Sequence, residues 1–475
     1  TSPCKSACPA HIAVQGYLKK AADGEYRDAL ALIKRQNPFP AVCGHICNRR
    51  CEDECTRGSI DEAVSIDAVK RFIADKDLEA EHRYVPKKVV PASTYKDHFD
   101  DKIAIIGSGP AGLSAAYYLA EKGYFPTVFE KNAEPGGMLR YGIPSYKLQK
   151  DVIKAEIDIM RELGVEIKTG VEVGKDITID ELRKQGYKCF YIAIGCSAGS
   201  RPGIPNDDAE GTFTAIDYLA QANCGDTKFK GDVVVIGGGN VAIDASRVSA
   251  RSGAKSVTQF SLESAEEMPA SDEEVFEAGE DGVKIENGWG PKEVLVKNGK
   301  VAGIVMKKCI SGFNDEGRFD PKYDEKETKE IKADRVIFAI GQRIVWGDLL
   351  KGTKVEFGRG NGPLADELTF QTAEPDIFVG GDVYTGPKFA IDAIAQGKIA
   401  AESLHRYAHD ANMTIGRNRW KFDMIDVDDI HVENYDKAPR QKEKYDPDLP
   451  KNTFKREKRA LTEDEVKIET ARCLK

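Results

Sequence analysis

Residues 102–131, KIAIIGSGPAGLSAAYYLAEKGYFPTVFEK, contain the pattern that most limits how this chain can fold. A short apolar run fits a buried strand and leads directly into Gly107, Gly109 and Gly112, which have G-x-G-x-x-G spacing. The first glycine permits a tight turn, the second lets the backbone approach a pyrophosphate, and the third lets the next helix pack closely on the strand. A second strand ends at Glu130, where an acid binds a ribose hydroxyl. The stretch therefore predicts a βαβ unit that binds a dinucleotide.

The same pattern returns at residues 231–240, GDVVVIGGGN. An apolar strand enters Gly237 and Gly239, and Ala242 stands at the third position, which is an accepted variant. The repeat predicts a second dinucleotide site. We expect FAD in the first site and a nicotinamide in the second, with hydride passing between the nicotinamide and flavin N5. Because that chemistry belongs to the cofactors and needs positioning above all, we assign no catalytic acid or base.

The strand after the second turn indicates which nicotinamide cofactor is bound. A strand-like run at 256–260 leads to Glu263. A terminal acid hydrogen-bonds the ribose diol of NAD(H), whereas the 2′-phosphate of NADP(H) requires Arg or Lys there. We therefore expect NAD(H) in preference to NADP(H). Arg247 and Arg251 on the preceding helix leave NADP(H) as the alternative.

Two later segments complete the expected flavin site. Residues 134–144, EPGGMLRYGIP, offer backbone amides to a cofactor, and a plain surface loop is the alternative. After Gly341 the chain returns to the first domain, where an apolar strand ends in Gly381 and Asp382; a surface turn is again the alternative. The residues expected at the flavin are Gly107, Gly109, Pro110, Ala111, Gly112, Glu130, Lys131, Gly137, Met138, Leu139, Gly381 and Asp382, and those at the nicotinamide are Gly237, Gly239, Asn240, Val241, Glu263 and Gly341.

Of the 11 cysteines, those before residue 56 are crowded together: Cys4, Cys8, Cys43, Cys47, Cys51 and Cys55. Such crowding in a large chain points to a metal or redox cofactor and not to a disulfide framework. Residues 4–9 have the C-x3-C-P form that ends a bacterial-ferredoxin cysteine run. A helical hairpin predicted at 12–36 would return the chain to the second cysteine group.

One cubane [4Fe-4S] cluster is our preferred assignment, with Cys8, Cys47, Cys51 and Cys55 as its ligands. Cys4 would then belong to a second cluster, completed by upstream residues or by a non-cysteine ligand, and Cys43 is the ambiguous member. Zinc and plain buried thiols remain the alternatives. Zinc modules usually carry C-x2-C pairs, which this chain lacks, so iron–sulfur is favoured.

Chain length and net charge limit the number of domains and the kind of partner that we expect. A chain of 475 residues predicts several domains, and a net charge of −9 argues against nucleic acid as a partner. Because the sequence shows no run long enough to cross a bilayer and no signal segment, we expect a cytoplasmic protein. The missing initial Met and the ending at Cys473-Leu-Lys indicate a piece of a longer protein.

The motifs CKSACPAHI, NPFPAVCGHIC, CEDEC, GSGPAGLSAAYYLA, EPGGMLRYGIP, GGGNVAIDA, EEMPA, AIGQ and GGDVYTGP resemble those of the glutamate synthase small subunit and its relatives. These relatives include the N-terminal half of dihydropyrimidine dehydrogenase and the large subunit of electron-bifurcating transhydrogenases. The resemblance implies an α/β fold with two Rossmann-like doubly wound domains, one inserted in the other, after a small α-helical iron–sulfur domain. The expected divisions are 1–90 for the cluster domain, 97–225 and 341–408 for the FAD domain, 226–340 for the inserted NAD(P) domain and 409–475 for an extended tail.

The resemblance also implies a function. The chain would transfer hydride between NAD(P)(H) and FAD, and single electrons through one or two [4Fe-4S] clusters. Its redox partner would be a subunit of a larger complex that carries further iron–sulfur or flavin centres. The glutamate synthase small subunit itself and a non-catalytic scaffold subunit that bears cofactors are the alternatives.

The chain departs from the family pattern in two places. Lys70 stands where a Gln completes a cluster in dihydropyrimidine dehydrogenase, and Leu262 and Glu263 stand where NADPH-using members carry arginines. The segment 134–144 contains no cysteine, which argues against a dithiol reductase. In the relatives an ARCL segment often opens another cluster domain, so Cys473 is expected to be the first ligand of such a domain.

Overall fold

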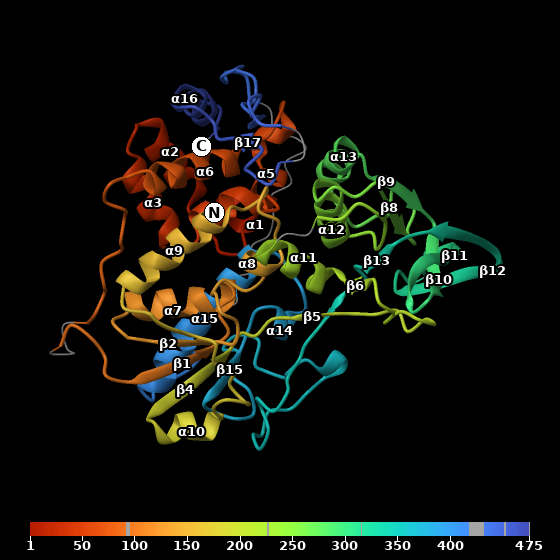
Figure 1. The fold of residues 1–475 in the computed structure, drawn as a ribbon. Helices are drawn as coiled ribbons and strands as arrows, with labels where there is room; N and C mark the ends of the chain where they lie inside the picture. The colour runs from red at the N-terminus through yellow and green to blue at the C-terminus, as the bar shows by residue number, and fades with distance from the viewer. Residues whose placement is uncertain (92–95, 226–227, 315, 418–431, 451–452, 475) are drawn as a thin grey trace.

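The computed structural model describes residues 1–91, 96–225, 228–314, 316–417, 432–450 and 453–474. A helical unit, a first α/β unit and a second α/β unit make up the molecule (Figure 1). This arrangement confirms the expected fold class, with two parallel sheets after a helical N-terminal region. Among the described helices, none is long and apolar enough to cross a membrane.

The N-terminal unit consists of short helices that carry the clustered cysteines. They are α1 (Pro3–Ala7), α2 (Val14–Ala22), α3 (Tyr26–Lys34), α4 (Pro40–Ile46), α5 (Arg50–Asp53), the 3₁₀ helix η1 (Thr56–Ser59) and α6 (Ile66–Leu78). The hairpin of α2 and α3 confirms the helical hairpin expected at 12–36. Helix α4 lies against α6 so closely that a Cβ at Gly44 would stand 2.8 Å from the Arg71 Cα.

The first α/β unit is built on a five-stranded parallel sheet with the strand order β15-β4-β1-β2-β3. Its elements are β1 (Lys102–Ile106), α7 (Pro110–Glu121), β2 (Thr127–Glu130), α8 (Met138–Tyr141), α9 (Lys150–Glu162), β3 (Glu166–Thr169), α10 (Ile179–Lys184), β4 (Tyr187–Ile192), β15 (Ile377–Val379), α14 (Asp382–Thr385) and α15 (Ala390–Ala408). Strand β15 pairs with β4, so the chain does return to this sheet after the second unit. Helices α15 and α7 touch where a Cβ at Gly397 would lie 2.3 Å from the Ala111 carbonyl oxygen.

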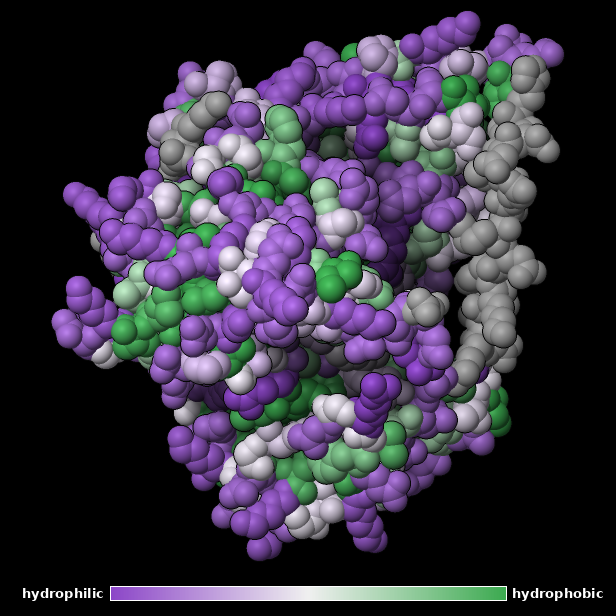
Figure 2. Space-filling view, turned by 90° about the vertical axis from the view of Figure 1, so that its right-hand side faces the viewer, coloured by the Kyte–Doolittle hydropathy of each residue, from purple (hydrophilic) through white to green (hydrophobic). Residues whose placement is uncertain are grey.

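The second α/β unit repeats this plan with the parallel order β6-β13-β7-β8-β9. It contains β6 (Thr212–Thr214), α11 (Ala215–Cys224), β7 (Asp232–Ile236), α12 (Asn240–Arg251), β8 (Ser256–Ser261), α13 (Asp272–Glu280), β9 (Lys284–Asn287) and β13 (Arg335–Phe338). An antiparallel sheet of β10 (Trp289–Lys297), β11 (Lys300–Phe313) and β12 (Phe319–Lys332) extends from it. The face of the molecule on that side is mostly hydrophilic, with separate apolar patches (Figure 2).

Two connections join the α/β units. Strand β5 (Ala198–Gly199) on the outward connection pairs antiparallel with β14 (Gln342–Arg343) on the return connection. The helical unit and the first sheet share one continuous buried core, whereas the second unit has cores of its own. The cysteine-bearing helices are therefore packed firmly on the first unit.

The C-terminal segment returns to the helical unit. It contains β16 (Lys444–Tyr445), β17 (Lys458–Arg459) and α16 (Glu463–Ala471). Helix α16 contacts α2 and α6, so the two ends of the described chain lie together (Figure 1). The capping box expected from Thr462 and Glu465 is confirmed at the start of α16. Part of the tail expected at 409–475, residues 418–431 and 451–452, lies outside the described residues.

Candidate functional site

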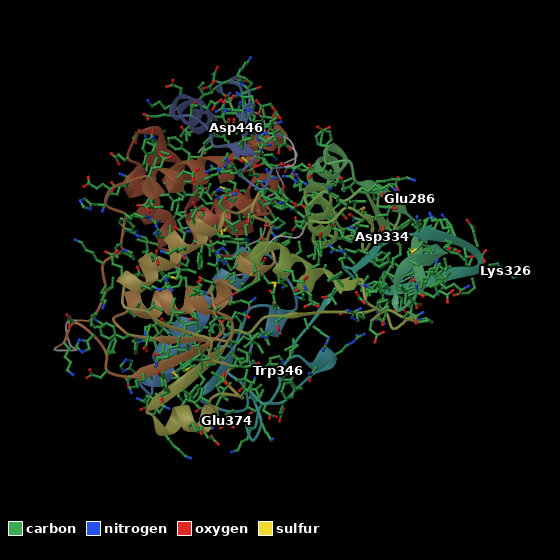
Figure 3. All side chains as sticks on the ribbon, in the orientation of Figure 1. Glu286, Lys326, Asp334, Trp346, Glu374 and Asp446 are labelled. Atoms are coloured by element: carbon green, nitrogen blue, oxygen red, sulfur yellow. The ribbon has the colours of Figure 1, made fainter. Side chains whose placement is uncertain are left out.

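A cavity of about 1,050 Å³ opens between the three units. Its wall includes Gly109 from the first glycine turn, Gly239 from the second and Cys47 from the end of α4. Trp346, on the connection that leads back to the first sheet, also lines it (Figure 3). Two nucleotide cradles and the cysteine group therefore face a common space.

The first cradle has the shape that a pyrophosphate needs. Gly107 has φ of +105°, and a Cβ there would stand 2.5 Å from the Ala193 carbonyl oxygen. At Gly112 a Cβ would lie 2.0 Å from the Gly107 oxygen, whereas at Gly109 no protein atom lies within 4 Å of the Cβ position. The turn is thus closed on its protein side and open toward the cavity. Helix α7 starts at Pro110 and presents its N-terminus there, which suits an anion.

The acid at the end of β2 braces this turn. Glu130 is 4% exposed and accepts hydrogen bonds from the Ser108 backbone N–H at 3.0 Å and from the Asn132 N–H at 2.8 Å. Both Glu130 and Lys131 line the cavity. Their place fits the ribose of a bound dinucleotide.

The loop at 134–144 closes the cradle from the side. Gly137 has φ of +55°, and a Cβ there would stand 2.8 Å from the Gly109 Cα. Gly137 precedes Met138 and Leu139 in α8, and all three residues line the cavity. The tight approach of two glycines leaves the backbone exposed to a ligand at this point.

The opposite wall is formed by the end of β15. Gly381 has φ of +74° and donates its N–H to the Gln396 side-chain oxygen at 2.7 Å. Burial raises the pKa of Asp382 to about 6, although the Lys388 N–H donates to its carboxylate at 3.2 Å and opposes the rise. Asp382 thus places a carboxyl group of raised pKa at the site. The glycine turn, the ribose acid and this wall together fit FAD.

The second cradle repeats the first glycine turn. Gly237 has φ of +147°, and a Cβ there would stand 2.4 Å from the Ala339 carbonyl oxygen. Gly239 is again open, with nothing within 4 Å of its Cβ position. Asn240, Val241 and Gly341 join it in the cavity wall. These residues fit the pyrophosphate and nicotinamide part of NAD(P)(H).

The acid of the second cradle is placed differently from Glu130. Glu263 is 9% exposed, accepts a hydrogen bond from the Ser261 hydroxyl, and has its carboxylate 2.6 Å from the Cβ position of Gly238. It lies behind the glycine turn, and the cavity wall does not include it.

The two helix arginines already have partners. The guanidinium groups of Arg247 and Arg251 pair with Asp281 at 2.8 Å and 2.9 Å, and both also pair with Glu457 of the C-terminal segment. Both guanidinium groups are therefore held by ion pairs within the protein.

The cysteines form two neighbourhoods. Burial raises the pKa of the Cys47 and Cys51 thiols, and the Lys70 ammonium beside them opposes the rise. The Cys8 thiol is close enough to raise the pKa of Cys47 further. Cys43 is buried in α4, and its thiol pKa is also raised by burial. Cys43, Cys47 and Cys51 thus lie near Lys70, and Cys8 lies near Cys47.

The other neighbourhood contains Cys4 and Cys55. Burial raises the pKa of the Cys4 thiol, and the charge of Cys55 adds to that rise. The assignment of Cys55 to the same cubane as Cys8, Cys47 and Cys51 stays a prediction.

The thiol groups of the cysteine unit are the candidate ligands for a cluster or a metal ion. Among the described residues, no group of three or more His, Cys, Asp or Glu is arranged to hold one metal ion. Zinc would need four ligands gathered tightly around one centre. Cys8 and Cys43 are buried, and Cys4, Cys47, Cys51 and Cys55 are partly buried.

Lys70, which the sequence shows to depart from the family pattern, lies beside the cysteines. It is 4% exposed, pairs with Asp67, and stands beside the thiols of Cys43 and Cys47. Burial lowers the pKa of Lys70, but Asp67 and the neighbouring thiols outweigh it and raise the pKa well above its usual value.

A partly buried lysine also links the two α/β units by ion pairs. Lys147, before α9, pairs with Asp244 of α12 and Glu274 of α13, both at 2.6 Å. All three residues line the cavity. No local sequence pattern predicts this contact, because the three residues come from separate segments of the chain.

Comparisons with known proteins agree with this geometry. The family described as "Pyridine nucleotide-disulphide oxidoreductase" matches residues 101–397, and that described as "Dihydroprymidine dehydrogenase domain II, 4Fe-4S cluster" matches residues 1–82. The "Glutamate synthase [NADPH] small chain" of Escherichia coli (strain K12) is 35% identical over 421 residues, covering 84% of this chain and 87% of that protein. The "NAD-dependent dihydropyrimidine dehydrogenase subunit PreT" of the same strain is 32% identical over 415 residues, covering 86% and 92%.

A third relative is longer than this chain. The "NADP(+)-dependent formate dehydrogenase subunit beta" of Moorella thermoacetica is 35% identical over 430 residues, which are 86% of this chain but only 60% of that protein. Among solved structures, FprA of Mycobacterium tuberculosis in complex with NADPH has a TM-score of 0.56 at 19% identity, covering 65% of this chain and 85% of that one. Thioredoxin reductase of T. acidophilum has a TM-score of 0.51 at 23% identity, covering 66% and 99%. These structures show the fold alone.

Proposed function

The chain belongs to the pyridine nucleotide-disulphide oxidoreductase family, and from this premise we propose that it exchanges hydride between NAD(H) and FAD and passes single electrons through [4Fe-4S] clusters to or from a partner subunit. One observation carries the proposal. Gly109, Gly239 and Cys47 line the same cavity, so the sites for all three cofactors face one space.

The residues of the first cradle hold and orient the flavin. The backbone at Gly107 and Gly109 and the N-terminus of α7 receive the pyrophosphate, and Glu130 receives the ribose. Gly381 and Asp382 face the cofactor from the end of β15. When bound, the flavin supplies the conversion between hydride transfer and single-electron transfer.

The second cradle positions the nicotinamide against the first. Gly239 and Asn240 open on the cavity and receive the pyrophosphate at the start of α12. The contacts of Lys147 with Asp244 and Glu274 keep α12 and α13 in place beside the first unit. The second cradle therefore contributes orientation, which is the main demand that hydride transfer makes on a protein.

Cys8, Cys47, Cys51 and Cys55 would hold the cluster nearest the cavity, since Cys47 is part of its wall. The buried cation of Lys70 offsets the negative charge that thiolates and sulfide bring. We expect this charge to favour the reduced, more negative state of the cluster. Electrons would leave through this side of the molecule.

We propose NAD(H) as the preferred nicotinamide. Glu263 is the acid that follows β8 in the second cradle. The nearby Arg247 and Arg251 are already paired with Asp281 and Glu457. The printed names of the relatives include both an NAD-dependent and an NADP(+)-dependent protein, so family membership alone leaves the choice open.

We further propose that the chain works in the cytoplasm, where thiols stay reduced, as one subunit of a larger complex. The relatives are named as a small chain and as subunits of larger enzymes. The second candidate is the glutamate synthase small subunit itself, favoured by the 87% of that relative's length that the chain covers. A co-purifying partner with an amidotransferase domain would identify it. A scaffold subunit would instead keep full complex activity when Gly239 is replaced by Val.

Anaerobic titration of the purified flavoprotein with NADH and with NADPH tests the proposal. We expect the flavin absorbance to bleach with NADH at lower concentration than with NADPH, and the broad iron–sulfur absorbance to fall afterwards. A flavin that stays oxidised under both cofactors contradicts the proposal. If the anaerobically purified chain contains no iron or sulfide, the proposed electron transfer through [4Fe-4S] clusters is contradicted.

A further inference from the structure

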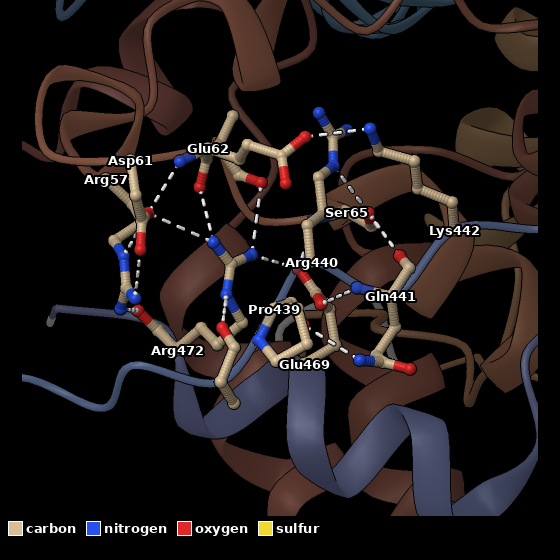
Figure 4. A network of polar contacts seen from close by, with 12 residues as sticks. Arg57, Asp61, Glu62, Ser65, Pro439, Arg440, Gln441, Lys442, Glu469 and Arg472 are labelled. Carbon is tan, nitrogen blue, oxygen red and sulfur yellow. Dashed lines mark hydrogen bonds and ion pairs between the residues drawn. The ribbon is translucent and has the colours of Figure 1, made fainter.

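The C-terminal segment is fastened to the helical unit by buried contacts. Arg472, just after α16, is 1% exposed, and Arg57 of the helical unit donates to its carbonyl oxygen at 2.8 Å (Figure 4). Glu469 of α16 is fully buried and accepts from the backbone N–H groups of Ser65 and Gln441 at 2.7 Å and 2.6 Å (Figure 4). The stretch between Gln441 and Glu469 therefore starts and ends on the helical unit.

This stretch extends to the second α/β unit. We call its described residues, 443–450 and 453–459, the clasp. Glu457 of the clasp pairs with Arg247 at 3.2 Å and also with Arg251, and both arginines lie on α12. Arg251 also donates to a backbone carbonyl oxygen of the clasp at 2.6 Å. The clasp thus holds the helix that begins at the second glycine turn.

The clasp contacts α13 as well. Lys458 pairs with Glu273 at 2.7 Å and with Glu277 at 2.6 Å, and the Tyr445 hydroxyl donates to Glu277 at 3.0 Å. Glu273 also pairs with Arg49 of the helical unit. The acidic side of α13 is therefore bound by cations that come from outside the second unit.

On its other side the clasp is bound to α6. Arg71 donates to the Glu443 carboxylate and to the Lys458 carbonyl oxygen, both at 2.6 Å. Arg456 pairs with Asp75 at 2.6 Å. The clasp is therefore a bridge from α6 of the helical unit to α12 and α13 of the second unit.

The second unit shares little buried core with the rest of the molecule. Among the described residues, Tyr146 is the only buried member of its core clusters that comes from outside residues 215–338. The guanidinium carbons of Arg247 and Arg251 lie 4.7 Å and 4.0 Å from the centre of the Tyr146 ring. Because polar contacts fix the second unit more than a shared core does, its position against the first unit depends on those contacts.

The clasp also belongs to the wall of the common cavity. Four of its charged residues line that cavity: Glu443, Arg456, Glu457 and Lys458. Both family matches end before the clasp, the later one at residue 397.

We propose that Glu457 and Lys458 are positioning residues for hydride transfer, because the clasp sets the position of the second cradle against the flavin. Neither residue takes part in the chemistry. Each acts through α12 or α13, the two helices beside the second cradle. A displacement of about 1 Å between reacting groups can cost a factor of about 100 in rate, so a loosened clasp slows the transfer. The inference rests on the proposed function, since it takes the two cradles to bind the flavin and the nicotinamide.

Stopped-flow reduction of the FAD-loaded full chain by NADH tests the inference. Glu457→Gln and Lys458→Met should each lower the limiting rate of flavin reduction by a factor of about 10 to 100. The NADH concentration that gives half of this rate, and the FAD content, should stay unchanged. Lys458→Arg keeps the charge and should restore most of the rate. Asp448→Asn, at an exposed carboxylate of the clasp, is the matched control and should change nothing.

These substitutions leave no buried charge without a partner. In Glu457→Gln, the guanidinium groups of Arg247 and Arg251 keep Asp281. In Lys458→Met, both carboxylates of α13 keep an arginine. We therefore expect the variants to fold.

Hydrogen exchange of the FAD-loaded proteins without NADH gives a readout that is independent of activity. In Glu457→Gln and Lys458→Met, the amides of the clasp and of α13 should lose protection, whereas those of β1 and β7 should keep it. Loss of protection in β7 would show that the substitution unfolds the second unit, and this overturns the positioning role.

An unchanged limiting rate in both variants overturns the inference. A higher half-saturating NADH concentration at an unchanged limiting rate overturns it too, because the clasp would then act in binding alone. A wild-type flavin that NADH does not reduce overturns the proposed function instead, so the two failures are distinguishable.

Discussion

The two nucleotide cradles have the same glycine turn but differ in the residues that surround it. In each, a left-handed glycine, Gly107 or Gly237, passes a neighbouring carbonyl oxygen at a distance that no side chain allows. In each, the second glycine, Gly109 or Gly239, is open toward the cavity. The shared part is the part that binds pyrophosphate.

The differences lie in what surrounds each turn. The first turn is braced by Glu130, has no room for a Cβ at Gly112, and belongs to a core that it shares with the helical unit. The second accepts Ala242, has its acid Glu263 behind the turn, and belongs to a smaller core. A rigid cradle suits a cofactor that stays bound, and a less constrained one suits a cofactor that must bind and leave. We therefore expect equal changes in the two cradles to have unequal effects.

The largest contrast is expected from valine at the open glycines. Gly109 and Gly239 have φ of −71° and −93°, and no atom lies within 4 Å of either Cβ position. The side chain therefore fits the fold but occupies the pyrophosphate site. Gly109→Val should lower FAD affinity by a factor of about 100 or more, and Gly239→Val should keep FAD but slow its reduction by NADH by a similar factor.

Flavin content after gel filtration and stopped-flow flavin bleaching measure the two effects. Gly279→Ala, at an exposed position of α13 outside the cavity wall with nothing within 4 Å of its Cβ position, serves as the control and should change neither. Loss of FAD from Gly239→Val would show that the cradles are not independent. Normal flavin reduction in Gly239→Val would instead favour the scaffold alternative.

The next contrast concerns the third position of each turn. In Gly112→Ala the new Cβ would lie 2.0 Å from the Gly107 carbonyl oxygen, so β1 and α7 must move apart. We expect a loss of about 3 kcal/mol in the stability of the first unit. Ala242→Gly removes one buried methyl group in a helix and should cost only about 1 kcal/mol.

Native-state hydrogen exchange separates the two units, because the amides of β1 and β7 report their own opening free energies. Protection should fall in β1 for Gly112→Ala and, more weakly, in β7 for Ala242→Gly. Equal losses in both variants would remove the claim that the first cradle is the more tightly packed one.

Much of this comparison was visible in the sequence. Strand, glycines and helix follow one another within about 30 residues, so a local pattern predicts both turns. The capping box at Thr462 and the helical hairpin of α2 and α3 were local in the same way and are confirmed.

Contacts between distant segments were not visible. Arg247 and Arg251 looked available for a phosphate because their partner Glu457 lies some 200 positions away along the chain. Helix α16 likewise packs against α2 and α6, which lie near the other end of the chain. Spacing along the chain cannot express such packing.

A third contrast is the pH dependence of stability. Only the first cradle should show it, through Asp382 at the end of β15. Asp382 is a carboxyl group whose pKa burial raises to about 6, whereas the corresponding turn of the second unit contains the uncharged Gly341 and Gln342. The folded state binds the proton of Asp382 more tightly than the unfolded state does. Its contribution to stability is therefore complete below about pH 4 and is lost as the pH rises to about 6.

Denaturant unfolding of the FAD-free protein between pH 4 and 7 checks this sign. The stability of the wild type relative to Asp382→Asn should fall by up to about 3 kcal/mol over that range and then stay level. Asp348→Asn, at an exposed carboxylate, is the matched control and should show no such trend. A difference that grows with pH would contradict the buried position of Asp382.

The smallest contrast is expected at the acid of the second cradle. In Glu263→Gln the carboxylate that disfavours a 2′-phosphate becomes neutral, while the hydrogen bond from Ser261 can remain. The preference for NADH over NADPH, measured as the ratio of kcat/KM values for flavin reduction, should fall about tenfold, which corresponds to about 1.4 kcal/mol. Glu266→Gln, at an exposed neighbour, controls for net charge and should leave the ratio unchanged. Because Glu263 lies behind the glycine turn and outside the cavity wall, an unchanged ratio in Glu263→Gln would mean that it supports the turn, as Glu130 does in the first cradle, and that cofactor choice lies elsewhere.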